Sequence, residues 1–163
     1  MAKPIQLITS VNATSYPTPM VDAQMPLGSE LTFVDGNGIK ATLKYVQAGA
    51  AGMAANGLYF IEPGYVTSVP ASSVVPKEFC LAEIAFTALY YGWVKVEGMG
   101  IAITGAGGSV ALNTGSLADG LTTVLDEAAA AETALTVCTN NETDLAGGVP
   151  ISVTLLRKRV TVA

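Results

Sequence analysis

The feature that most constrains this chain is a long series of short β-type segments separated by glycine-containing turns. From residue 30 onwards, runs rich in valine, isoleucine, threonine and leucine recur about every 8–12 residues, a spacing typical of antiparallel sandwiches and barrels. The series includes ELTFV, IKATLKYV, GLYFI, GWVKVEG, GIAIT, SVALNTG, LTTVLD, ALTVCTN and PISVTLLRKRV. The sequence therefore predicts an all-β fold, either an antiparallel β-barrel or a jelly-roll-like sandwich.

Three local patterns refine this prediction. The runs DGNG at residues 35–38 and Pro63-Gly64 favour the tight turns of two hairpins. The run EFCLAEIAF, residues 78–86, is too apolar for a half-exposed strand, and we expect it to be buried on both faces. Only DEAAAAETAL, residues 126–135, is typical of a helix. We expect at most one short helical turn there, and a loop or a strand stays open because short helices need packing.

Residues 1–28 are expected to form an extended arm. Pro17, Pro19 and Pro26 exclude helix interiors and central strands. The arm also carries apolar residues, which a purely disordered tail mostly lacks: Ile5, Leu7, Val11, Tyr16, Met20 and Met25. An extended, apolar arm favours strand addition to a neighbour, or draping over one. Residues 29–163 are expected to form a single β-domain.

The scarcity of charge predicts contact with another protein subunit. Charged residues make up 13% of the chain and hydrophobic residues 50%, against a usual charged share of about 25%. Because large apolar patches are uncommon on soluble monomers, we expect a homo-oligomer or a partner that covers apolar surface. The net charge of −5 argues against nucleic acid. The longest apolar stretches are interrupted by charges, which argues against a membrane, and the first residues lack the apolar region of a signal peptide, so we expect synthesis in a cytoplasm.

The residue types that most catalytic and metal sites need are scarce. The chain has no histidine, and Cys80 and Cys138 lie far apart, which excludes the usual triads and zinc or haem sites. The glycine-rich run from Gly98 to Gly108 contains IAIT, a strand former, rather than the helix opening of a dinucleotide site. Carboxylate pairs remain, and NNETD at residues 140–144 has the oxygen ligands that Ca²⁺ prefers, although a plain turn is the simpler interpretation. We predict a non-enzymatic protein with no cofactor, no small-molecule substrate and no catalytic or metal residue.

An aromatic segment, ALYYGWVKVEG at residues 88–98, is the strongest candidate for a binding surface. In a strand, Trp93, Lys95 and Glu97 share one face, and Val94 and Val96 share the other. The valines are expected to face a core, which places Trp93 on the more polar side or at a rim. Three interpretations are open: a second buried layer of the fold, an interface with a subunit or partner, or a platform for a carbohydrate or a base.

Three consecutive cations, Arg157-Lys158-Arg159, follow the last apolar run. Within a strand their side chains would alternate between the two faces, so they would form no single patch. We interpret them either as a solvated edge that resists aggregation or as a contact with an acidic partner.

The order of these segments resembles the head decoration, or cement, proteins of tailed bacteriophages. The matching pieces are CLAEIAFTALYYGWVKVEG, SVALNTGSLADGL, the alanine-rich DEAAAAETAL and LAGGVPISVTLL, over roughly residues 30–157. The most specific of them is Tyr91-Gly92-Trp93-Val94. The proline-rich arm and the cations through Arg159 depart from the pattern, which bears on the mode of attachment. The resemblance implies a β-barrel or jelly-roll-like domain, often trimeric, that clamps capsid subunits and has no catalytic residue.

We therefore expect a virion structural protein that decorates and stabilises a tailed-phage capsid. It would bind between major capsid protein subunits on the capsid exterior, after synthesis in the bacterial cytoplasm, as a homo-oligomer with a trimer favoured. A tail, spike or adhesin module that binds a host glycan is the alternative, and the main-shell protein and an enzyme rank lower. The expected partner-binding residues are Tyr16, Met20, Met25, Tyr90, Tyr91, Trp93, Arg157 and Arg159.

Overall fold

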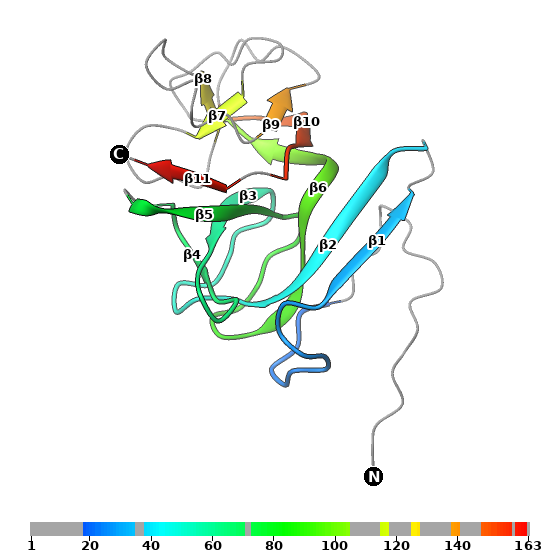
Figure 1. Cartoon of the computed structure of the whole chain (residues 1–163), viewed down its shortest axis with the longest axis vertical. Helices are drawn as coiled ribbons and strands as arrows, with labels where there is room; N and C mark the ends of the chain where they lie inside the picture. The colour runs from blue at the N-terminus through cyan, green and yellow to red at the C-terminus, as the bar shows by residue number, and fades with distance from the viewer. Residues whose placement is uncertain are drawn as a thin grey trace.

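The described part of the chain is all-β and antiparallel, as predicted, and contains no helix (Figure 1). The computed structural model describes residues 18–34, 38–70, 73–104, 115–117, 125–127, 138–140, 148–157 and 159–162, with the backbone alone at 73–76, 115–117, 125–127, 138–140 and 159–162. The strands are β1 Glu30–Val34, β2 Lys40–Gln47, β3 Gly57–Ile61, β4 Thr67–Ser68, β5 Ser73–Ala82, β6 Tyr91–Ile103, β7 Gly115–Leu117, β8 Leu125–Glu127, β9 Cys138–Asn140, β10 Pro150–Leu155 and β11 Arg159–Val162.

One antiparallel sheet contains most of these strands. Its main path runs β1-β2-β6-β5-β3-β4, while β10 pairs with β6, β9 with β10, and β11 with β5. Strands β7 and β8 form a separate two-stranded ladder. In the described residues the path does not close on itself, although an isolated bridge between Gln47 and Val66 brings its last strands beside the end of β2. The arrangement is an open, sandwich-like sheet rather than a closed barrel.

Strand β6 serves both halves of the sheet because it bends at Gly98. Residues 91–97 pair with β2, and residues 98–103 pair with β10. Gly98 has a φ of 108°, and a Cβ atom there would lie 2.8 Å from the carbonyl oxygen of Lys40. Figure 1 shows β6 turning near its end. The first part of the glycine-rich run is therefore a strand, as IAIT predicted.

Apolar side chains form two clusters on opposite faces of β3 and β5. Phe79 and Leu81 belong to one cluster, and Cys80 and Ala82 belong to the other; all four are buried. The run that begins at Glu78 is thus buried on both faces as far as Ala82, where β5 ends. Val94 and Val96 of β6 also lie in the second cluster, which confirms that they face a core.

Strand pairing confirms both predicted hairpins. β1 pairs with β2, β3 pairs with β4, and Gly64 has the positive φ of 84° that its turn requires. The C-terminal run is two strands rather than one, because β10 pairs with β6 and β11 pairs with β5. Of the alternatives left open for residues 126–135, Asp126 and Glu127 belong to strand β8, and residues 128–135 lie outside the described part.

The described part of the arm lies against the chain's own sheet. We call residues 18–29 the strap. The main chain of Met20 exchanges two hydrogen bonds with Tyr91, at 2.9 and 2.8 Å. Further along, Gln24 N donates to the Tyr45 hydroxyl at 3.0 Å, and Gly28 N donates to the Tyr45 carbonyl at 2.8 Å. The strap therefore drapes over its own chain, and residues 1–17 lie outside the described part.

Candidate interaction surface

The predicted partner-binding residues fall in two places. One group lies in or beside the strap, where β6 begins: Met20, Met25, Tyr90, Tyr91 and Trp93. The other place is the segment after β10, where Arg157 lies close to β1 and β5. Tyr16 and the side chain of Arg159 lie outside the described part, although the backbone of Arg159 pairs with Glu78.

Trp93 is buried and does not lie on a polar rim. It is 5% exposed, and its ring packs edge-on to that of Tyr45, with centroids 5.3 Å apart and planes at 64°. Together with Leu43 these two rings form a cluster against which the strap residues Met25 and Leu27 pack. We call it the strap cluster. Of the three interpretations of Trp93 that the sequence left open, the structure supports a second buried layer of the fold. Alternation along the strand predicted that the Trp93 face would be polar, but the strap covers this face.

Exposed apolar side chains gather instead where β2 ends and β6 begins. Met20, Tyr65 and Leu89 are 50%, 41% and 57% exposed, and we call them the rim patch. Two facing residues of the β2–β6 ladder, Gln47 and Tyr91, hold them together. Gln47 N donates to the Tyr65 carbonyl at 3.0 Å, Gln47 Nε2 donates to the Leu89 carbonyl at 3.1 Å, and Tyr91 binds the Met20 main chain.

Two of the three rim residues have strained backbones. Tyr65 has a φ of 62° and Leu89 a φ of 65°, in the left-handed region that bulky residues rarely adopt. Both lie in tight turns, because Tyr65 N donates to the Glu62 carbonyl at 2.9 Å, and Tyr90 N donates to the Thr87 carbonyl at 3.1 Å. Such conformations cost about 1–3 kcal/mol each and gather at functional sites. Glycine would form either turn without strain, although its greater flexibility in the unfolded chain would offset part of that gain.

Sequence reasoning missed Tyr65 and Leu89 as surface residues. The Pro63-Gly64 pair indicated a turn but not that the following residue, Tyr65, would also adopt a positive φ. The turn around Leu89, TALY, contains no glycine or asparagine to mark a positive φ. Gln47, which donates hydrogen bonds to the carbonyls of both Tyr65 and Leu89, brings the two turns together.

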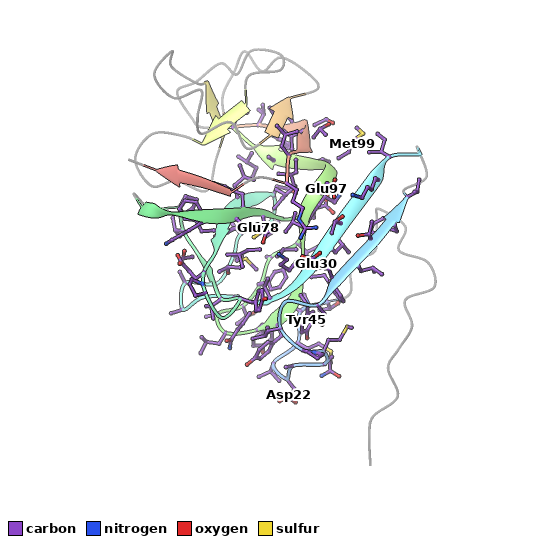
Figure 2. All side chains as sticks on the ribbon, in the orientation of Figure 1. Asp22, Glu30, Tyr45, Glu78, Glu97 and Met99 are labelled. Carbon is purple, nitrogen blue, oxygen red and sulfur yellow. The ribbon has the colours of Figure 1, made fainter. Side chains whose placement is uncertain are left out.

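A second cluster is a partly buried charge network between β1, β2 and β5. Lys44 Nζ binds Glu78 Oε2 and, at 3.1 Å, Glu30 Oε1. Arg157 binds Glu30 at 2.5 Å and Glu78 at 3.6 Å. The side chains of Lys44 and Glu78 are 6% and 9% exposed, and Figure 2 labels both glutamates in the middle of the molecule. Arg157, although 42% exposed, is thus bound within its own chain, and an acidic partner would have to share it with Glu30.

The surroundings hold two glutamates of this region in their ionised form. Burial opposes ionisation of Glu30, but hydrogen bonds from Lys44 and Arg157 outweigh it and lower the pKa of Glu30. The pKa of Glu97 is also lowered, chiefly by a hydrogen bond of 2.8 Å from the Thr42 hydroxyl. Both carboxylates therefore stabilise the fold while they are charged.

Acid is expected to destabilise the protein. The pKa of Glu62 is lowered as well, because hydrogen bonds from Lys77 and Ser68 outweigh its burial. A carboxyl group whose pKa in the folded state lies below its ordinary value of 4.5 stabilises the fold above that pH, and this stability is lost as the pH falls through the folded-state pKa. The urea concentration at the midpoint of unfolding is expected to decrease as the pH drops below about 4.5. Glu97→Gln should make this decrease smaller, because one of the three carboxylates is then absent. A midpoint that stays constant down to about pH 3 would contradict this expectation.

Lys95 and Cys80 are two further buried ionisable groups of the described residues. Lys95, 4% exposed, binds Glu83 Oε1 at 2.5 Å and also the Met99 carbonyl. Burial raises the pKa of the Cys80 thiol, which makes it inert at neutral pH.

Within the described residues, no three metal-ligating side chains come together, and residues 141–144 of the calcium alternative lie outside that part. The same described residues contain no helix long and apolar enough to cross a membrane.

Comparisons with protein-family models, curated proteins and solved structures find no match to this chain. A functional proposal therefore depends on the surfaces of the chain itself and on its sequence pattern.

Proposed function

We propose that this chain is a non-enzymatic structural protein that decorates and stabilises the capsid of a tailed bacteriophage. In this proposal it binds between major capsid protein subunits on the outside of the shell. The reason for proposing a capsid as the partner is the sequence resemblance, of which Tyr91-Gly92-Trp93-Val94 is the most specific part. The observation that supports a binding role is the rim patch, in which two of the three exposed residues, Tyr65 and Leu89, lie in strained turns.

The rim patch suits a protein partner for a physical reason. Backbone strain that folding does not require is found where a site needs it. Here the strain keeps the Leu89 side chain 57% exposed and the Tyr65 side chain, whose ring also packs over Gly28 of the strap, 41% exposed. Their exposure is unfavourable in the free protein and is relieved when a partner covers them. The low charge content of the chain, 13%, supplies further apolar surface for such a contact.

Binding of this kind stabilises a shell without any chemistry. A protein that binds only the assembled shell stabilises it by about 2.7 kcal/mol per site when its concentration is about 100 times Kd. The effect is repeated at every lattice site, and a homo-oligomer that engages several sites at once adds avidity. We therefore include a homo-oligomer in the proposal, for which the sequence resemblance implies a trimer.

Leu89→Gly is expected to weaken capsid binding without destabilising the protein. Glycine adopts the left-handed turn without strain, which offsets the roughly 0.5–1 kcal/mol that its flexibility costs in folding. We expect the free energy of unfolding to stay within about 1 kcal/mol of the wild type. The affinity for expanded, empty heads, measured by co-sedimentation, is expected to fall about tenfold or more.

The matched control is Ile101→Ala. Ile101 is 50% exposed and lies near the opposite end of β6 from the rim patch, so its loss should change neither stability nor binding. Wild-type affinity in Leu89→Gly would exclude the rim patch as the contact surface. Failure of the wild-type protein to bind heads at micromolar concentration would exclude the capsid proposal itself.

The glycan-binding alternative predicts a different result in the same samples. A sugar that stacks on Trp93 should change the tryptophan fluorescence when host polysaccharide is added. Because Trp93 is 5% exposed, the strap residues Met25 and Leu27 would first have to move aside. Saturable head binding with no spectral response to polysaccharide would favour the capsid proposal over this alternative.

A further inference from the structure

Among the described strands, β1, at one end of the sheet, has an open edge. It pairs with β2 on one side, and no described strand lies on its other side (Figure 1). The other end of the main path, β4, is two residues long, and short edge strands resist the addition of another strand. β1 is five residues long and has no proline, no lysine and no bulge in its ladder. Such an edge is a template for a further strand.

The main-chain groups on the open edge belong to Glu30, Thr32 and Val34. Tyr45 N donates to the Ser29 carbonyl at 2.8 Å, so the carbonyl of Ser29 points towards β2. Along a strand these directions alternate, which directs the N–H and carbonyl groups of the next even-numbered residues away from β2. The open edge therefore offers its donors and acceptors at three alternate positions.

The side chains of β1 match a second copy of β1 in one antiparallel register. With Thr32 facing Thr32 of the second copy, Leu31 faces Phe33 and Glu30 faces Val34. Leu31 and Phe33 are half-buried and pack against the strap cluster, so the pairing would continue that apolar layer into the second copy. Val34, 66% exposed, would gain a neighbour. The register places no like charges opposite each other, because Glu30 is the one charged residue of β1.

We propose that two copies of this chain join by antiparallel pairing of their β1 edges, across a two-fold axis at Thr32. About six main-chain hydrogen bonds would form, two for each facing pair. Glu30 would keep its contacts with Lys44 and Arg157 of its own chain, so no charge would lose its partner. In a two-fold contact each β1 edge pairs with the other, so the dimer leaves no free β1 edge for a third copy. The pairing does not depend on the capsid proposal, and it predicts an even number of copies where the resemblance implies a trimer.

Register-specific cross-linking tests this pairing. The Cα atoms of facing residues in a hydrogen-bonded pair are about 5.5 Å apart, within the range of a disulfide. In a Cys138→Ser background, Thr32→Cys is expected to give a covalent dimer, twice 16.6 kDa, under mild oxidation. Val34→Cys is the matched control: it is exposed, but in this register the two copies of residue 34 lie about 13 Å apart and should not cross-link. Cys80 is buried and does not compete.

A second pair of variants tests the hydrogen bonds. Thr32→Pro removes an N–H that points away from β2, a change that an edge strand tolerates, and should weaken association about tenfold or more in sedimentation equilibrium. Thr32→Val also loses the 3.2 Å contact with the Thr42 hydroxyl but keeps the N–H, and should associate like the wild type. A wild-type protein that is a monomer or a trimer up to about 100 µM overturns the proposal. So does Thr32→Cys cross-linking no better than Val34→Cys, the result expected if a different strand occupies the edge.

Discussion

Trp93→Ala is expected to lower the free energy of unfolding by about 3–5 kcal/mol, the usual loss when a large buried aromatic side chain is truncated. The ring is 5% exposed, contacts Tyr45 edge-on and belongs to the cluster that the strap residues Met25 and Leu27 cover. Its removal leaves a cavity beneath a strap that a few hydrogen bonds hold. Because Trp93 is the single tryptophan of the chain, far-UV circular dichroism must follow the urea unfolding.

Ile101→Ala again serves as the control, because Ile101 lies in the same strand but is 50% exposed. Its free energy of unfolding should change by no more than about 0.5 kcal/mol. A loss below about 1 kcal/mol in Trp93→Ala would mean that the strap does not cover the ring in solution, which would return Trp93 to the surface as a direct partner contact. If Trp93→Ala lowers the free energy of unfolding as much as expected, weaker capsid binding by this variant could result from its lower stability and would not identify Trp93 as a contact. Leu89→Gly, which should keep its stability, is then the variant that tests the contact surface.

Lys44→Met is also expected to destabilise the protein by about 3–5 kcal/mol, because removal of one partner of a buried ion pair leaves the other charge uncompensated. Glu78, 9% exposed, would retain the more distant Arg157 at 3.6 Å. Glu78→Met should lower the free energy of unfolding by a similar amount, because Lys44 would lose its contact with Glu78 and retain only its ion pair with Glu30. Urea unfolding followed by Trp93 fluorescence measures both losses.

The double variant Lys44→Met/Glu78→Met is expected to recover most of this stability and to lie within about 1–2 kcal/mol of the wild type. It leaves neither buried charge, while Glu30 and Arg157 still bind each other at 2.5 Å. Strictly additive losses would show that the two buried charges are not coupled. Lys40→Met supplies the surface comparison, since Lys40 is 60% exposed in its pair with Glu97 and its loss should cost no more than about 1 kcal/mol.

Much of the fold could be predicted because its signals are local. The turns that contain Gly38 and Gly64 depend on glycines that adopt positive φ, and alternation identified Val94 and Val96 as core residues. Burial on both faces, predicted for residues 78–86, holds as far as Ala82, where β5 ends; beyond it Ala85 is exposed. The division of the C-terminal run into two strands was not predicted. It arises because β10 pairs with β6 and β11 pairs with β5, and no local sequence pattern encodes a pairing partner.

The candidate surface was predicted only in part, for the same reason. Alternation correctly set Trp93 opposite the two valines, but the residues that cover it lie in the strap, far away in sequence. Met20 and Tyr91 were expected at a binding surface, and the structure does bring them together. Leu89, the residue whose replacement tests the proposed function, lies inside the aromatic segment at residues 88–98, but no glycine or asparagine beside it marks its positive φ.

The sequence by itself determined that the described segments are β-type, that β1–β2 and β3–β4 are hairpins, and that Val94 and Val96 face a core, because these properties depend on neighbours within a few residues. Only the tertiary structure decided that Gln47 holds Tyr65 and Leu89 at one rim, and that Lys44 meets Glu78, 34 residues further along the chain. Such contacts join distant segments, and their energies depend on strand pairing and on burial away from water. Neither quantity exists until the sheet has formed.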